Sequence, residues 1–149
     1  MLIKIFVGLN SRKFEALAWQ SSKFCLSMMI KNSEDKLVWR FISVYGSPYD
    51  EGKPEFIKEL HSLLENWDGP TLIGGDFNLV ASVREKSNGI VNHKWMDLFQ
   101  EWIHNFGLLE LKNSSRSYTW TNNQDQPIMA AINKLFLTLY LSKNFLEPL

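Results

Sequence analysis

The sequence predicts one α/β domain in which mixed, mostly antiparallel strands pack against flanking helices. Three patterns lead to this fold class. Residues 23–31 and 37–45 are two strand-like runs separated by a turn cluster, which is typical of a β-hairpin. Residues 54–67 have apolar side chains at helical spacing, and a strand-like run follows them directly. Residues 95–106 form a second helical pattern with an aromatic face. Such alternation of strands and amphipathic helices defines the α/β class.

Composition supports a single domain that spans residues 1–149. The chain is 45% hydrophobic and 13% aromatic, which is enough apolar mass for a core and excludes a disordered chain. The formal net charge is zero, so no overall positive field attracts nucleic acid. Cys25 is the single cysteine, which excludes an internal disulfide and favours a buried thiol in an intracellular compartment, either nucleus or cytoplasm. No run is apolar and long enough to span a membrane.

The first part of the chain is predicted to form strands. Residues 2–7 are mostly apolar and read as a strand, whereas residues 12–20 are compatible with a strand or a single helical turn. Residues 24–30 alternate in the manner of a strand, and a turn cluster follows at residues 32–35. Bulky side chains occupy both faces of residues 37–44, which predicts a strand that is covered on both sides.

A helix then connects this strand to the next one. The helix begins near Pro54 and Glu55, which suit a first turn, and residues 69–70 (Gly-Pro) stop it. Residues 71–75 follow as a short buried strand, so the predicted unit is strand, helix, strand. The apolar positions of the helix are Phe56, Ile57, Leu60, Leu63, Leu64 and Trp67.

The second half contains one more helix and several short strands. A charged loop precedes the helix at residues 95–106, and Gly107 closes it. The remaining predicted elements are strands at residues 108–111, 118–121 and 132–141 and a turn at residues 122–127.

The run from Leu72 to Asn78 carries the most chemical information. A period of two places Asp76 and Asn78 on the same side of an extended chain, and Gly74 and Gly75 let a ligand or another backbone approach closely. A carboxylate beside an amide can orient a water or a metal-bound oxygen, as hydrolysis of a phosphate ester requires. The same residue types are common turn formers, so the run alone leaves a turn and an active site as alternatives.

The order of the motifs gives this run a context. Over residues 20–145 the chain resembles the endonuclease/exonuclease/phosphatase superfamily, which has the deoxyribonuclease-I-like fold. More narrowly, it resembles the endonuclease domain of plant non-long-terminal-repeat retrotransposons. The resemblance implies a partial four-layer α/β sandwich with two mixed sheets face to face and helices outside. The segments that carry it are residues 39–48, 67–70, 74–78, 84–89, 106–108 and 117–122.

The resemblance also implies roles for particular residues. Tyr45 matches a tyrosine that contacts the phosphate, Asp76 an aspartate that orients or deprotonates the attacking water, and Asn78 an asparagine that positions the water and the phosphate. Tyr118 and Trp120 match a segment near the DNA-facing rim and are weaker candidates for substrate binding, with core packing as their alternative role. The implied cofactor is Mg²⁺ or Mn²⁺, which Asp76 could bind through a water, and the implied partner is DNA.

Three expected features of the family are not matched. The family has a metal-binding glutamate near its start, and neither Asn10 nor Glu15 stands in that context. It ends on a Ser-Asp-His motif that has no counterpart here. Asn133 occupies the position of an aspartate that orients the catalytic histidine, and Lys134 keeps the positive charge of the arginine that follows it. The sequence therefore predicts a domain that is truncated at both ends and has weak or no nuclease activity.

Three functions remain open at this point. The first is a metal-dependent phosphodiesterase of the DNA endonuclease type, a hydrolase acting on ester bonds, of retrotransposon origin. The second is a phosphomonoesterase or phosphoinositide phosphatase of the same superfamily, which an activity comparison would distinguish. The third is a catalytically dead structural or interaction remnant, which a missing metal site would support.

Overall fold

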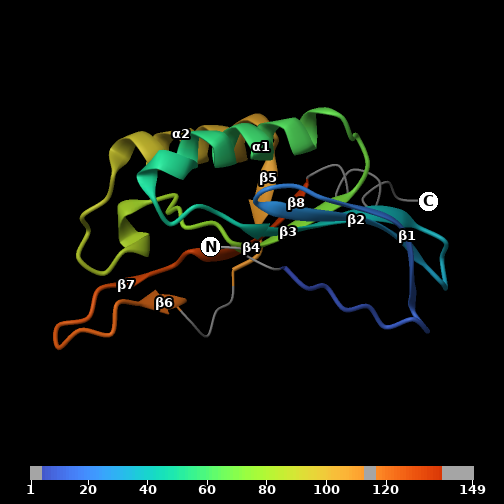
Figure 1. The fold of residues 1–149 in the computed structure, drawn as a ribbon, viewed down its shortest axis with the longest axis horizontal. Coiled ribbons are helices and arrows are strands. Elements are labelled where there is room, and N and C mark those ends of the chain that lie inside the picture. The colour runs from blue at the N-terminus through green and yellow to red at the C-terminus, as the bar shows by residue number, and fades with distance from the viewer. Residues whose placement is uncertain (1–4, 113–116, 139–149) are drawn as a thin grey trace, which may run out of the picture.

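A six-stranded sheet with both helices on one face organises the molecule (Figure 1). The computed structural model describes residues 5–112 and 117–138. The strand order is β1-β2-β3-β4-β8-β5, and a separate two-stranded ribbon, β6-β7, lies on the other side of the sheet. The elements are β1 (Phe14–Ser21), β2 (Cys25–Asn32), β3 (Val38–Tyr45), α1 (Lys53–Glu65), β4 (Thr71–Asp76), α2 (His93–Asn105), β5 (Leu108–Glu110), β6 (Trp120–Thr121), β7 (Met129–Ala130) and β8 (Asn133–Thr138), with short 3₁₀ helices η1 (Asp50–Gly52) and η2 (Val83–Glu85).

The predicted hairpin is confirmed. Strands β2 and β3 pair antiparallel with Cys25 opposite Val44. Residues 12–20, which left two possibilities open, contribute to a strand, β1, that pairs antiparallel with β2 and forms the edge of the sheet. The strand predicted at residues 2–7 is wrong over its described part, because residues 5–7 belong to no strand.

The predicted strand–helix–strand unit is also confirmed. Strands β3 and β4 are parallel neighbours, so the crossover helix α1 packs back onto the sheet. The backbone of Gly75 has φ +141°, and a Cβ there would collide with the backbone of Val44. Gly75 therefore allows β3 and β4 to approach closely.

Aromatic rings fill the space between the helices and the sheet. Phe77 is fully buried, with its ring centroid 5.4 Å from those of Phe99 and Phe136 and 6.0 Å from that of Trp102. The predicted aromatic faces of both helices thus form the core. Cys25 is a buried free thiol whose pKa is raised chiefly by desolvation, which fits an unreactive core residue.

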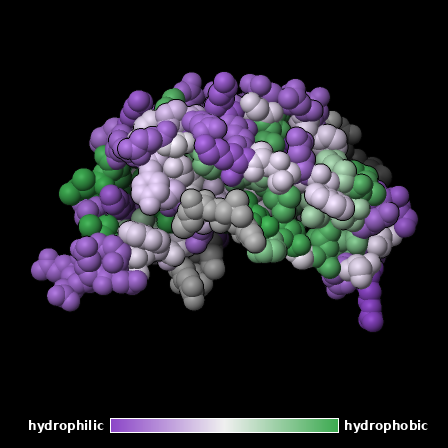
Figure 2. Space-filling model, in the orientation of Figure 1, coloured by the Kyte–Doolittle hydropathy of each residue, from purple (hydrophilic) through white to green (hydrophobic). Residues whose placement is uncertain are grey.

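The two helices carry the end signals that the sequence suggested. Pro54 lies in the first turn of α1. The side chain of Asn92 caps α2 by accepting the backbone N–H of Lys94 at 3.1 Å, and Gly107 follows α2 with φ +58°. Hydrophilic side chains cover the helix layer, while hydrophobic ones gather lower, at the level of the sheet (Figure 2). Among the described helices, none is long and apolar enough to cross a membrane.

The sheet face away from the helices is also apolar. Alternation along the strands directs a second set of half-buried side chains to this face, which neither helix covers (Figure 1). This set includes Leu26, Met28, Phe41, Leu72, Leu135 and Leu137. The described residues thus form one helix layer, one mixed sheet and a small ribbon, which confirms the mixed α/β class with flanking helices.

The C-terminal elements differ in length from their predictions. Strand β8 confirms the strand predicted at residues 132–141, whose last three residues lie outside the described part of the chain. Strand β6 keeps two of the four residues predicted at 118–121. No pattern in the sequence predicted β7, because a two-residue strand has too few positions for a period to be recognised.

Candidate active site

Three of the candidate residues end up side by side on adjacent strands. Tyr45 ends β3 and is the register partner of Asp76 at the end of β4. Asp76 is in turn the partner of Asn133, the first residue of β8. Since neighbouring strands lie about 4.8 Å apart, the three backbones are in direct succession across the sheet. The fold thus gathers residues that are up to 88 positions apart in sequence, as follows from their numbers.

The chain turns immediately after Asp76. The backbone N–H of Asn78 donates to Oδ1 of Asp76 at 2.8 Å, and Asn78 has φ +49°. This is an Asx turn, in which asparagine tolerates the left-handed conformation better than most residues. The expectation that Asp76 and Asn78 share one side of an extended strand is therefore wrong, because the strand ends at Asp76. The turn and the candidate site are the same structure.

The amide of Asn78 ties this turn to the neighbouring loop. Its Nδ2 donates to the carbonyl oxygen of Gly46 at 2.8 Å, while the N–H of Gly46 donates to the carbonyl oxygen of Asp76 at 2.7 Å. The loops that follow β3 and β4 are thereby held together next to Tyr45 and Asp76. The side-chain nitrogen of Asn78 is used in the protein, which leaves its Oδ1 as the atom that can face a ligand.

Lys53 is a residue of the site that the sequence analysis missed. It is buried, with 7% exposure, and its Nζ donates to the carbonyl oxygens of Ser47 and Asn78, both at 2.9 Å. The first residue of α1 thus holds both loops together. One signal in the sequence points to it: a lysine in the first turn opposes the helix macrodipole, so it needs a compensating contact.

The electrostatics of the site oppose ionisation of Asp76. Desolvation raises the pKa of Asp76, and the Asn78 N–H bond and the charge of Lys53 counteract part of the rise. Burial lowers the pKa of Lys53, against the attraction of Asp50 and Asp76. A carboxylate with a raised pKa is a stronger proton acceptor than an ordinary one, which suits a general base.

Replacing Asp76 with asparagine is expected to stabilise the fold at neutral pH. The pKa of this carboxyl is higher in the folded chain than its ordinary value of 3.8 in the unfolded chain. Its ionisation therefore lowers the free energy of unfolding as the pH rises above 3.8, and this loss of stability is absent at lower pH. We expect Asp76→Asn to raise Tm by roughly 1–2 °C at pH 7, a small gain because solvent screens a partly exposed group. The gain should vanish near pH 3 in a calorimetric series.

Asp35→Asn is a matched control that should change Tm in the opposite direction. Asp35 also accepts an N–H two residues on, from Leu37 at 3.0 Å, but this bond lowers its pKa. Its charge therefore favours folding above the ordinary pKa, and the control should lower Tm slightly at pH 7. A lower Tm for Asp76→Asn than for the wild type at pH 7 would contradict the expectation.

The predicted rim segment is fastened to β8 through Thr119. Its Oγ1 accepts the backbone N–H groups of Ile132 and Asn133, both at 3.0 Å. Trp120 follows on β6 and is 46% exposed, whereas Tyr118 is half-buried. The segment therefore sits directly beside Asn133. Substrate contact by Trp120 and Tyr118 stays a prediction.

The described residues supply few ligands for a metal ion. No group of three His, Cys, Asp or Glu side chains within residues 5–112 and 117–138 is arranged to hold one. Asp76 contributes one carboxylate, of which Oδ1 already accepts the N–H of Asn78. Mg²⁺ needs six oxygen ligands, several of them usually water. These described residues alone do not form a metal centre.

Comparison of the whole chain with known proteins gives a consistent answer at the level of structure. No family model matches the sequence, and neither does any curated protein. Among solved structures, the endonuclease domain of TRAS1, a telomere-specific non-LTR retrotransposon, superposes with a TM-score of 0.58 at 13% identity, over 75% of this chain and 50% of that one. An endonuclease/exonuclease/phosphatase from Bacteroides vulgatus gives a TM-score of 0.56 at 13% identity, over 87% of this chain and 56% of that one. The chain has the endonuclease/exonuclease/phosphatase fold.

This fold accommodates several activities. A humanised D. rerio TDP2 superposes with a TM-score of 0.54 at 12% identity, over 87% of this chain and 54% of that one. A mannosyl-6-phosphatase from Bacteroides thetaiotaomicron gives 0.52 at 13% identity, over 87% of this chain and 54% of that one. The chain spans about half the length of these endonuclease/exonuclease/phosphatase structures. The superfamily resemblance read from the sequence motifs is confirmed at the level of fold.

Proposed function

We propose that this chain carries the water-positioning part of a metal-dependent phosphodiesterase site of the DNA endonuclease type, of retrotransposon origin, with weak or no activity in these 149 residues alone. One observation carries the proposal. Tyr45 and Asp76 are register partners at the ends of two parallel strands, and Asn78 locks the loops that follow both strands. A phosphate at this edge of the sheet would meet all three residues.

Asp76 is the proton acceptor in this proposal. Its Oδ1 is held by the N–H of Asn78, so Oδ2 is the atom that takes a proton from the attacking water. The water oxygen then forms a bond to phosphorus while the ester oxygen opposite leaves, as in-line displacement requires. Tyr45 can donate its hydroxyl proton in a hydrogen bond to a phosphate oxygen. A divalent ion would add charge neutralisation at the phosphate.

Two observations support weak activity. Asn133 is neutral and directly opposite Asp76, where the resemblance leads one to expect an aspartate. Within the described residues, Asp76 belongs to no group of three His, Cys, Asp or Glu side chains that could hold a metal ion. These same observations favour a second candidate, a DNA-binding remnant without catalysis, over a phosphatase. DNA as substrate is supported by the exposed ring of Trp120, since bases stack on exposed aromatic side chains.

Nicking of supercoiled plasmid in Mg²⁺ or Mn²⁺ tests the proposal. We expect slow nicking that Asp76→Asn reduces by roughly 10²–10⁴-fold, because this substitution removes the base but retains an oxygen for the N–H of Asn78. Asp35→Asn, the same change in a distant Asx turn, should leave the rate unchanged. Nicking that survives Asp76→Asn would contradict the assignment. No nicking by folded wild-type protein that still binds DNA would favour the remnant.

A further inference from the structure

A cleft with charged residues in its lining lies beside the candidate site, at the start of β8. Its volume is about 770 Å³, in the range of ligand sites. Gly75 and Asn133 line it, and they are the chain neighbour and the strand neighbour of Asp76. The cleft therefore begins where the candidate site ends. The charged residues that line it are Arg84, Glu85, Glu110, Lys112 and Lys134.

The floor of the cleft is a buried ion-pair cluster. The side chain of Lys134 is 1% exposed, and its Nζ lies 2.8 Å from Oε1 of Glu85 and 3.5 Å from Oε1 of Glu110. The second oxygen of Glu85 accepts the backbone N–H of Ala81 at 2.6 Å. The acidic groups are thus engaged by the protein itself, and they hold the loop before α2 and the end of β5 against β8.

The positive charges that a ligand could reach lie on the walls of the cleft. Arg84 on η2 and Lys112 just after β5 are both exposed, and neither forms an ion pair within the described ranges. With these two cations added to the floor cluster, the cleft has a net charge of +1 in a chain whose total charge is zero. Arg84 and Lys112 therefore supply exposed positive charge next to the candidate site, where it can attract a polyanion.

We infer that this cleft binds the phosphate backbone of a DNA strand on one side of the scissile bond, with Arg84 and Lys112 each contacting a phosphate. The identity of the ligand rests on the proposed function. A strand whose scissile phosphate lies at Asp76 passes Asn133 next and enters the cleft. The two cations then neutralise successive phosphate charges, while Lys134 and the N–H of Ala81 offset part of the negative charge of the two floor carboxylates.

Binding without catalysis provides the test. The full chain is titrated with a short fluorescent duplex in EDTA, at salt concentrations from about 50 to 200 mM, and the slope of log K against log salt is measured by anisotropy. We expect the double variant Arg84→Gln/Lys112→Gln to reduce this slope by roughly 1.8, about 0.9 for each lost phosphate contact. Between about 50 and 200 mM salt, the factor by which affinity falls should then be about tenfold smaller for the double variant than for the wild type.

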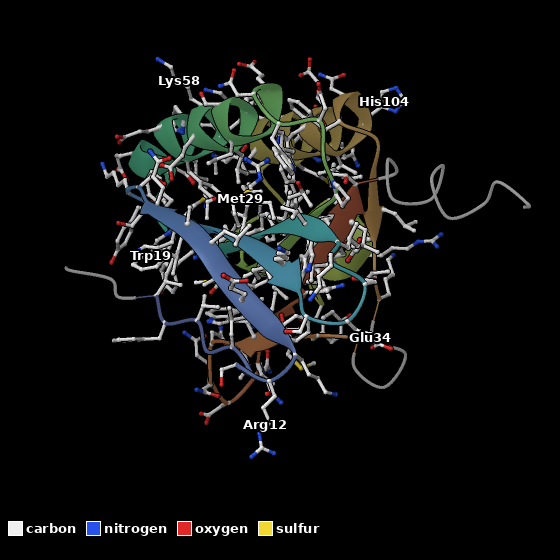
Figure 3. The ribbon with its side chains drawn as sticks, turned by 90° about the vertical axis from the view of Figure 1, so that its right-hand side faces the viewer. Arg12, Trp19, Met29, Glu34, Lys58 and His104 are labelled. Atoms are coloured by element: carbon white, nitrogen blue, oxygen red, sulfur yellow. The ribbon has the colours of Figure 1, made fainter. Side chains whose placement is uncertain are left out.

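Two other exposed cations give a matched control. Arg12 and Lys58 project from opposite sides of the molecule (Figure 3), and neither lines the cleft. Arg12→Gln/Lys58→Gln removes the same charges and should leave the slope nearly unchanged. An equal slope change in both double variants, with circular dichroism showing both folded, would overturn the inference.

The remaining outcomes test the DNA-binding role of the cleft and the catalytic role of Asp76 independently. If the slope changes as expected but no Asp76-dependent nicking is found, the cleft stands and the catalytic proposal fails. If nicking depends on Asp76 but Arg84→Gln/Lys112→Gln binds like the control, the proposed function stands and the cleft assignment fails. Absence of any binding by wild-type protein at the lowest salt overturns the cleft assignment as well.

Discussion

Phe77→Ala is expected to cost about 3–5 kcal/mol of unfolding free energy, which for a domain of this size threatens folding altogether. Phe77 is 0% exposed and its ring packs against rings from α1, α2 and β8. Truncation removes these contacts and leaves a cavity that rigid aromatic neighbours cannot fill.

The same substitution should also disorganise the site. Phe77 lies between Asp76 and Asn78, so its buried ring anchors the turn that positions both. We expect faster hydrogen exchange of the Asn78 amide, whose N–H is held by Asp76, in addition to a lower urea midpoint. Phe77→Leu keeps most of the apolar volume and should be substantially milder.

Phe6→Ala is the matched control for the aromatic truncation. Phe6 is 86% exposed, so the same loss of a ring should change stability by no more than about 0.5 kcal/mol. If Phe77→Ala were as mild as Phe6→Ala, Phe77 would not anchor the core, and the link between core packing and the site would have to be abandoned.

Lys134→Met should be the second strongly destabilising change, by about 3–5 kcal/mol at neutral pH. The substitution retains the apolar stem but leaves Glu85 and Glu110 without the buried cation that they share. Urea unfolding at neutral pH measures the loss.

Two variants isolate the cause. Lys23→Met breaks an ion pair of similar length, 2.6 Å to Glu55, whose side chains are 61% and 58% exposed, and it should cost less than about 1 kcal/mol. Adding Glu85→Gln to Lys134→Met should restore part of the lost stability, because it removes one unpaired charge. Equal losses of unfolding free energy in Lys23→Met and Lys134→Met would show that the buried cluster stabilises the fold no more than an exposed ion pair does.

Local patterns in the sequence were sufficient for much of the fold. The hairpin of β2 and β3, both helices and the strand–helix–strand unit follow from periodicity and from end signals such as Pro54 and Gly107. These signals act within a few residues, because a helix or strand repeats its environment every 3.6 or 2 positions. The same local patterns place Asp76 at the end of a strand beside an amide, whereas Tyr45 became a candidate only through the family resemblance.

Long-range contacts account for what periodicity missed. Pairing of β4 with β8 puts Asn133 next to Asp76 across 57 positions, a register that depends on how the whole core packs. The two lysines are a further case, since a lysine in a sequence is expected on the surface. Lys53 and Lys134 are buried only because distant carbonyl and carboxylate groups meet them in the fold.

At the turn that contains Asn78, the local sequence does not determine the backbone conformation, and tertiary packing does. Its residue types were compatible with both an active site and a turn, and nothing within the run could choose between an extended and a bent chain. Burial of Phe77 in the core directs the chain away from the strand after Asp76, and the carbonyl of Gly46 then receives the Asn78 amide. The sequence alone shows which functional groups are present. The direction in which each group points is determined by the packing of the core.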